Sequence, residues 1–247
     1  MQNLYSKGFE KLYDEMYQVF IDYENEFNFY NSVIKKNKAT NVLEIGCGSG
    51  HLAKHFIASG IDYYGMDLSS DMINLSRKRN PKGTFIQGNM TDFSLTTKVD
   101  ATLITGRTTS YLNTNLSVYN MLNAIYNNLN KDGILCFDFI DANRFFAVIK
   151  DGKEMIHNAN INERNYSRIS FMEPDKKNEN FMFQWNSKYY ETNNSGSKIL
   201  IEDISTVRAF TKNEWELFLK LSNFKIIEIV DRKSYAFDTY VIVAQKQ

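Results

Sequence analysis

Hydrophobic and polar residues follow two alternating patterns between residues 41 and 139. Short runs rich in β-branched and aromatic residues predict strands over 41–46, 62–67, 83–88, 100–105 and 133–139. Between these runs, apolar residues recur every three or four positions, which predicts helices over 51–60, 69–80 and 115–130. Strands and helices that alternate in this way are typical of parallel βαβ units.

The two ends of the chain extend this pattern differently. Residues 4–36 are predicted to form an amphipathic helix rich in tyrosine and phenylalanine. Near the C-terminus, strand runs at 225–231 and 239–245 are separated by only seven residues, whereas a parallel crossover needs about a dozen. We therefore expect a mostly parallel sheet that carries one antiparallel strand at its end. Thr211 and Glu214 form a predicted capping box that opens the helix before this pair.

The stretch between the fifth strand and the last helix has no helical periodicity. Three β-rich runs over 167–174, 180–192 and 198–210 are broken by the polar stretches 175–180 and 193–197. This pattern predicts an inserted antiparallel meander. Its aromatic residues, which include Trp185, Tyr189 and Tyr190, fit a half-buried sheet, and a homodimer interface or a substrate lid is the alternative.

Composition narrows the classes of partner. The 247 residues contain 29 lysines and arginines and 29 aspartates and glutamates, so no global charge favours nucleic acid or anionic membrane. We find no signal-peptide h-region and no run of about 18 apolar residues, as a membrane span requires. Two cysteines form neither a C-x-x-C pair nor a disulfide framework. We expect a cytoplasmic protein with a small-molecule partner.

The turn after the first strand carries the clearest chemical signal. In "NVLEIGCGSGHLAKHF" (41–56), Gly46, Gly48 and Gly50 join a strand to a helix, where backbone can approach a ligand closely. A dinucleotide fingerprint reads G-x-G-x-x-G, and here His51 stands at the position of the third glycine. This departure counts against NAD or FAD. A purely structural turn is the alternative.

Polar residues follow the first three strands. Glu44 precedes the first glycine and suits an ammonium group, and Asp67 lies about 20 residues further on, where an acid can bind ribose hydroxyls. Asn89 and Met90 follow the third strand and suit an adenine edge and face. Each residue also has an alternative role without a ligand. Glu44 could be a solvated acid at the strand end, Asp67 could cap the next helix, and Met90 could belong to the core. Together the residues point to S-adenosylmethionine, which has adenine, ribose and ammonium groups but no phosphate.

At this point the sequence resembles the class I S-adenosylmethionine-dependent methyltransferases. "VLEIGCGSG" looks like their first motif, "GMDLS" like their ribose-acid motif and "GNMTDF" like their adenine motif. Within this class, "LSSDMINLSRKRNPKGTFIQGNMTDFSL" and "AFTKNEWELFLKLSNF" look similar to amino-sugar N-methyltransferases of macrolide pathways, which usually have aspartate at the position of Asn89. The predicted cofactor-binding residues are Tyr13, Glu44, Gly46, Cys47, Gly48, Gly50, Asp67, Leu68, Met72, Asn89, Met90 and Thr105.

Three residues are predicted to act on the methyl acceptor. Tyr13 matches a tyrosine that lies near the methyl donor in the amino-sugar enzymes, although it could simply belong to an apolar helix face. Arg107 follows the fourth strand and could hold a carboxylate or phosphate, with a structural salt bridge as the alternative. Tyr111 stands where the amino-sugar enzymes carry histidine, so a histidine-dependent role does not carry over.

The resemblance implies one fold and one function. We expect an α/β fold: a Rossmann-like, doubly wound, mostly parallel sheet with an antiparallel last strand and a small antiparallel β insertion. We expect a single methyltransferase domain over 1–247, made of a helical segment (1–37), a core (38–152 and 209–247) and the insertion (153–208). It would transfer a methyl group from S-adenosylmethionine to an amine or hydroxyl by in-line displacement.

The same residues leave two alternative functions and raise the question of a metal site. An NAD-dependent oxidoreductase lacks the third fingerprint glycine, and a non-catalytic S-adenosylmethionine-binding protein would keep the same pocket. His51 and His55 are spaced to share one helix face, yet no acid lies between them and no third ligand is evident, so we expect packing or surface roles and no metal.

Overall fold

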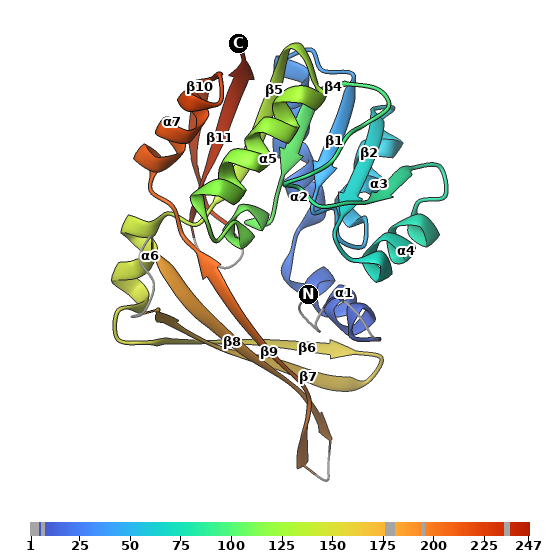
Figure 1. Cartoon of the computed structure of the whole chain (residues 1–247). Coiled ribbons are helices and arrows are strands. Elements are labelled where there is room, and N and C mark those ends of the chain that lie inside the picture. The colour runs from blue at the N-terminus through green and yellow to red at the C-terminus, as the bar shows by residue number, and fades with distance from the viewer. Residues whose placement is uncertain (1–4, 6–7, 176–180, 194–195, 235–237) are drawn as a thin grey trace.

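The computed structural model describes residues 5, 8–175, 181–193, 196–234 and 238–247 and contains two sheets (Figure 1). The larger sheet has seven strands in the order β10-β11-β5-β4-β1-β2-β3. Its strands are β1 (Asn41–Ile45), β2 (Asp62–Asp67), β3 (Thr84–Gln87), β4 (Val99–Ile104), β5 (Leu129–Phe139), β10 (Phe224–Arg232) and β11 (Thr239–Lys246). Strands β1 to β5 pair in parallel, and β11 is antiparallel to both β5 and β10.

The predicted fold class is confirmed, with one difference in detail. The antiparallel strand is the last in the chain, but β11 lies between β10 and β5 and not at the edge of the sheet. The short connection still enforces antiparallel pairing of β10 with β11, as predicted, although residues 235–237 lie outside the described part. Strand order reverses at β1, with β2 on one side and β4 on the other. Ligands of open α/β sheets bind at such a switch point, beyond the carboxyl ends of the strands.

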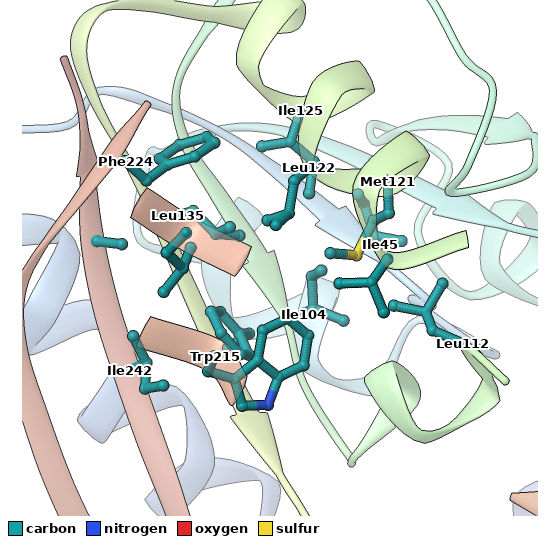
Figure 2. Packing of buried hydrophobic residues seen from close by; sticks show 14 of the residues in the cluster. Ile45, Ile104, Leu112, Met121, Leu122, Ile125, Leu135, Trp215, Phe224 and Ile242 are labelled. Atoms are coloured by element: carbon teal, nitrogen blue, oxygen red, sulfur yellow. The ribbon is translucent and has the colours of Figure 1, made fainter. Parts of the chain in front are cut away.

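Helices cover both faces of the larger sheet, while α1 and α6 pack on the smaller one. The α-helices are α1 (Phe9–Phe20), α2 (Tyr23–Lys36), α3 (His51–Ala58), α4 (Ser70–Arg79), α5 (Asn115–Asn128), α6 (Ala142–Ile149) and α7 (Lys212–Leu221). On one face α5 and α7 bury a cluster that includes Trp215, which packs edge-on against Phe137 with 4.5 Å between ring centroids. Figure 2 shows α5 side chains meeting Trp215 and residues of the sheet there. On the other face α2 and α3 bury a second cluster around Tyr30 and Phe56.

Two helix starts follow the predicted capping chemistry. The Ser69 side chain accepts a hydrogen bond from the Met72 amide at the start of α4. Thr211 and Glu214 make the reciprocal bonds of a capping box at the start of α7. Helix α6 was not predicted; it is short, and the Asp141 side chain caps it by accepting from the Arg144 amide.

The prediction of one helix over 4–36 was wrong. Helix α1 ends at Phe20, because Ile21 takes an extended conformation and the Asp22 side chain caps the start of α2 by accepting from the Asn25 amide. Residues 4, 6 and 7 of the predicted helix lie outside the described part. The break separates two roles, since α2 packs on the larger sheet while α1 packs through Met16 on the smaller one.

The smaller sheet has four antiparallel strands and not the predicted three. They are β6 (Lys153–Ile161), β7 (Arg164–Pro174), β8 (Met182–Asn193) and β9 (Gly196–Arg208). Strand β6 was missed because its inward positions include His157 and Ala159, which give weak hydrophobic alternation. The predicted breaks at 175–180 and 193–197 fall largely outside the described residues.

In Figure 1 the smaller sheet lies beyond the carboxyl ends of the larger sheet's parallel strands, with α1 between the two. None of the helices in the described part of the chain is long and apolar enough to span a bilayer.

Candidate active site

A cavity of about 560 Å³ lies at the switch point of the larger sheet. Its volume is within the range of roughly 300–1,000 Å³ that is usual for small-molecule sites. The glycine turn, the end of β2 and the segment after β3 form one side, while α1, the segment after β4 and the edge of β9 form the other. The lining residues include Tyr5, Tyr13, Gly46, Gly48, Asp67, Leu68, Met72, Asn89, Met90, Gly106, Tyr111, Asn113, Ile204, Ser205 and Thr206.

The glycine turn brings backbone to the cavity wall. The Gly46 and Cys47 amides donate to the Met66 carbonyl at 2.7 and 3.0 Å, which fixes the turn against β2. Gly46 has φ +75°, and an added Cβ would lie 2.7 Å from the Thr108 hydroxyl oxygen. Gly48 has φ +53° with open space where a side chain would begin. Glycine is therefore required at the first position for space and at both for conformation.

Asp67 ends β2 with its carboxylate oriented by backbone. One carboxylate oxygen accepts from the Gly48 amide at 2.9 Å, and the other accepts from the Ser69 amide at 2.8 Å. Each oxygen keeps a further lone pair for a ligand hydroxyl. Burial raises the pKa of Asp67, and the backbone hydrogen bonds oppose this shift. Among the described lining residues it is the only one with a charged side chain.

Glu44 lies behind the glycine turn and not on the cavity wall. It is 2% exposed, and its carboxylate accepts from the Tyr63 hydroxyl at 2.5 Å and from the Thr105 hydroxyl at 3.2 Å. Burial raises its pKa to about 7, against these hydrogen bonds. The structure therefore does not bring the carboxylate into the lining, and its direct contact with an ammonium group stays a prediction.

The segment after β3 places Asn89 and Met90 in the lining. The Asn89 side-chain oxygen already accepts from the amide and the hydroxyl of Thr91, both at 3.0 Å. Its amide nitrogen is thus the group better placed to meet a ligand. Met90 lines the cavity and also packs against the core of the larger sheet. Its position therefore fits both the predicted place beside adenine and the alternative of a core residue.

Tyrosines form the wall opposite the glycine turn. Tyr13 and Tyr111 both line the cavity, as Tyr5 does, and the hydroxyl oxygens of Tyr5 and Tyr111 are 2.9 Å apart. The Tyr5 and Tyr13 rings meet edge-on at 5.0 Å between centroids. Sequence reasoning missed Tyr5, although its place in the aromatic-rich N-terminal segment was a signal.

The edge of β9 completes this end of the cavity through residues 204–206, which no motif marks. The Ser205 hydroxyl donates to the carboxylate of the buried residue Asp203 at 3.2 Å. Burial raises the pKa of Asp203, while the Ser205 bond and the charge of Arg168 lower it. No sequence signal could have found this pair, because only the folded sheet brings β9 to the cavity.

Arg107 does not reach the large cavity. It has φ +63°, its amide donates to the Asp138 carboxylate at 2.7 Å, and its side chain lines a separate small cavity. Burial raises the pKa of Asp138 to about 6, and the Arg107 charge opposes the shift. Gly106 and Thr108 lie in the lining of the large cavity on either side of this left-handed turn, and Arg107 does not. Its contact with a carboxylate or phosphate of the acceptor stays a prediction.

The structure thus divides the predicted residues into two groups. Those in the lining of the large cavity are Tyr13, Gly46, Gly48, Asp67, Leu68, Met72, Asn89, Met90 and Tyr111. Those outside it are Glu44, Cys47, Gly50, Thr105 and Arg107. Cys47 is buried in the α2–α3 cluster, and Gly50 starts α3, where an added Cβ would lie 2.7 Å from the Asn80 amide nitrogen.

A buried acid that sequence reasoning missed ties α1 to the glycine turn. The Asp14 carboxylate accepts hydrogen bonds from Ser49, from His51 Nε2 at 2.7 Å and from Arg79 at 2.7 Å. These bonds lower its pKa to about 2, although burial alone would raise it. Because α1 also carries Tyr13, this network holds one wall of the cavity against the other.

Both histidines of α3 have packing partners. Besides its bond to Asp14, His51 stacks on Tyr23, and His55 stacks on Phe27, with 4.8 and 5.6 Å between ring centroids. Over the described residues, no group of three or more histidine, cysteine or acidic side chains could hold a metal ion.

Comparisons with known proteins agree with this geometry. A model of the methyltransferase domain matches residues 42–133. The chain is 38% identical over 77 residues to a dTDP-3-amino-3,4,6-trideoxy-α-D-glucopyranose N,N-dimethyltransferase of Streptomyces venezuelae, covering 31% of this chain and 32% of that protein. It is 34% identical over 94 residues to a dTDP-3-amino-3,6-dideoxy-α-D-glucopyranose N,N-dimethyltransferase of Streptomyces fradiae, 37% of each. The matched parts span about a third of the length of these two relatives.

Solved structures show the same fold over nearly the whole chain. Streptomyces venezuelae DesVI superposes with a TM-score of 0.80 at 20% identity, covering 95% of this chain and 98% of that one. S-adenosylmethionine-bound CalS10, an amino pentose methyltransferase from Micromonospora echinaspora, superposes with a TM-score of 0.74 at 18% identity and full coverage of both chains. The domain match thus shows a methyltransferase domain over residues 42–133. The chain is similar over about a third of its length to the two amino-sugar N,N-dimethyltransferases, and it shares the fold of the solved methyltransferase structures.

Proposed function

We propose that this protein transfers a methyl group from S-adenosylmethionine to an amine or hydroxyl of a small molecule. The observation that carries the proposal is the charge of the large cavity. Its described lining contains Asp67 but no lysine, arginine or histidine. Such a site suits a cationic nucleoside without phosphate, whereas the diphosphate of NAD would meet only a carboxylate there.

The residues present fit S-adenosylmethionine. The oriented Asp67 carboxylate can accept from ribose hydroxyls, and Asn89 and Met90 offer an amide and a thioether to adenine. Gly48 and Gly106 both line the cavity and have open space where a side chain would begin, so backbone can approach the ligand at both points. The buried Glu44, whose pKa is about 7, lies behind the turn, and an ammonium group on the cavity side would stabilise its ionised form.

The chain's own contribution to the reaction is mainly positioning. When bound, S-adenosylmethionine supplies an electrophilic methyl group. The hydroxyls of Tyr5 and Tyr111 and the ring of Tyr13 can orient the acceptor, and orientation alone can account for several kcal/mol of barrier reduction, of the order of 7–11 in favourable cases. The Ser205 hydroxyl can pass a proton from the acceptor to the Asp203 carboxylate.

The printed activities of the two partial relatives favour an amine acceptor. Both are dTDP-amino-sugar N,N-dimethyltransferases, and we propose an amino sugar or a similar polar amine for this chain. Turnover of such an amine, measured as release of S-adenosylhomocysteine, would separate an enzyme from a protein that only binds the cofactor.

Calorimetry with S-adenosylhomocysteine tests the cofactor half of the proposal. We expect binding by the natural protein, weakening of about tenfold or more by Asp67→Asn, and little change by Asp62→Asn, which alters the exposed start of the same strand. NADH should not compete. Absence of binding to the natural protein, or preference for NADH, would refute the proposal.

A further inference from the structure

A second cavity of about 20 Å³ lies behind the acceptor end of the large one and is lined by basic residues. Its lining contains the basic residues Arg107, Arg168 and His157. The other described lining residues are aromatic or apolar and include Tyr17 and Trp185. No acidic side chain is present among its described lining residues. The charged side chains of its described lining are therefore basic, whereas the large cavity has only Asp67, and the Asp138 and Asp203 carboxylates interact with the two arginines from outside this lining.

Arg168 is a buried cation whose described hydrogen bonds all go to neutral hydroxyls, although its charge also acts on the Asp203 carboxylate. It is 8% exposed on β7, and its guanidinium donates to the Ser187 hydroxyl at 3.3 and 3.1 Å and to the Tyr17 hydroxyl. It also lies over the Trp185 and Tyr189 rings, at 5.3 and 5.5 Å from their centroids. None of the ion pairs in the described part of the chain includes it. Burying a cation without a direct ion pair is costly, so a ligand anion would gain from this site.

His157 faces the same space. It lies directly opposite Arg168 in the pairing of β6 with β7. Its Nδ1 atom is buried and makes no hydrogen bond within the described structure. Burial and the positive charges of Arg168 and Arg107 lower its pKa. The cavity thus presents two guanidinium groups and one imidazole that lacks a partner.

The wall between the two cavities is thin. Arg107 stands between Gly106 and Thr108, which both line the large cavity. Tyr13 lines the large cavity and Tyr17 the small one, and their rings stack with 4.0 Å between centroids. The two cavities therefore share a wall made of Arg107 and the Tyr13–Tyr17 ring pair.

We propose that the cavity between Arg107, His157 and Arg168 binds a terminal oxygen of an oxyanion, carboxylate or phosphate, carried by the methyl acceptor. Its volume holds about one oxygen-sized atom, since a water needs roughly 10–15 Å³ on the same measure. Guanidinium groups match oxyanions in charge and hydrogen-bond geometry. This inference rests on the proposed function, because the large cavity offers no cation to an anionic acceptor.

Trp185 provides a direct probe. The chain has two tryptophans, Trp185 in the small cavity and Trp215 in the core of the larger sheet, so protein labelled with 5-fluorotryptophan gives two ¹⁹F resonances. Titration with sodium acetate, sodium phosphate and dTDP should shift the Trp185 resonance saturably and leave that of Trp215 in place. A response to acetate alone identifies a carboxylate, and a response to phosphate or dTDP identifies a phosphate.

Matched variants complete the test. Arg168→Gln should remove the ¹⁹F response, while Arg164→Gln, at the exposed end of the same strand, should keep it. No saturable shift in the natural protein, an unchanged response in Arg168→Gln, or an equal response to sodium chloride at matched ionic strength would overturn the inference. S-adenosylhomocysteine is titrated into the same samples. Its binding without an oxyanion response refutes this site alone, whereas a failure to bind it refutes the proposed function.

Discussion

The two sheets of this protein are built by different rules. The seven-stranded sheet is covered on both faces, so strands such as β11 are buried at nearly every central position. The four-stranded sheet has one inner face, and β6 alternates between exposed and partly buried residues. That inner face also carries polar side chains, including Arg168, Ser187 and Asp203. We therefore propose that the first sheet forms the cofactor side of the site and the second sheet forms the acceptor side.

The largest expected effect concerns the glycine turn. Gly46→Ala should abolish measurable S-adenosylhomocysteine binding, because its Cβ would lie 2.7 Å from Thr108 and the turn would have to move. Gly60→Ala is the matched control, since Gly60 has a similar φ of +84° but open space around it. It should cost about 1–2 kcal/mol of stability from backbone strain and leave binding intact. Calorimetry and urea unfolding of both variants measure this, and equal binding by the two would contradict the account.

The next effect compares the cores of the two sheets. Trp215→Ala should lower the free energy of unfolding by about 3–5 kcal/mol, because Trp215 is fully buried among Phe137, Phe139 and Phe210. Trp185→Ala should cost less, since its ring is only partly buried on the smaller sheet. Urea denaturation of both variants gives the two values. A larger loss of unfolding free energy for Trp185→Ala than for Trp215→Ala would contradict this comparison, because the smaller sheet would then have the more tightly packed core.

Glu44 should produce a pH dependence of stability. Its pKa is about 7 in the folded protein and near 4.5 in an unfolded chain, so the folded state binds the proton more tightly. Stability therefore falls as pH rises from about 4.5 to 7, by on the order of 3 kcal/mol. Glu44→Gln should remove this contribution, and Asp138, whose pKa is also raised, acts equally in both proteins. The measurement is urea unfolding at about pH 5 and pH 8.

Exposed Glu216 of α7 supplies the control for that experiment, because Glu216→Gln should keep the pH dependence of the natural protein. Identical pH profiles for the natural protein and Glu44→Gln would show that Glu44 titrates normally and is not the buried acid described above.

The smallest effect concerns the contact of α1 with the glycine turn. Asp14→Asn removes the charge that Ser49, His51 and Arg79 bind, and we expect a loss of about 2 kcal/mol. Faster amide hydrogen exchange should be confined to α1, while α2 stays protected. Glu15→Gln, exposed on the same helix, should change neither quantity. Unchanged exchange in Asp14→Asn would mean that α1 is held by its apolar face instead.

Sequence predicted the larger sheet well because its signals are local. The glycine turn, the acid at the end of β2 and the caps at Ser69 and Thr211 each lie within a few residues of the element that they define. The lining at Ile204, Ser205 and Thr206 depends on strands that meet only in the fold. The sequence also could not show that Arg107 lines the small cavity and not the large one, because this depends on the left-handed turn at that residue.

Strand β6 and the break between α1 and α2 escaped prediction for a related reason. His157 interrupts the apolar inner face of β6 and the apolar Ile156 lies on its outer face, which hides the two-residue period that marks a half-buried strand. The aromatic pattern of the N-terminus continues across Ile21 and Asp22, so only the capping role of Asp22 distinguishes two helices from one. Asp14 gave no signal at all, since its three partners come from distant elements.

A crystal structure with S-adenosylhomocysteine tests the central claim most directly. The account predicts the nucleoside in the large cavity, with ribose hydroxyls hydrogen-bonded to Asp67, adenine beside Asn89 and Met90, and the amino acid end at the Gly46–Gly48 backbone. An empty cavity at saturating ligand, or a nucleoside bound with Asp67 turned away from its ribose, would contradict it.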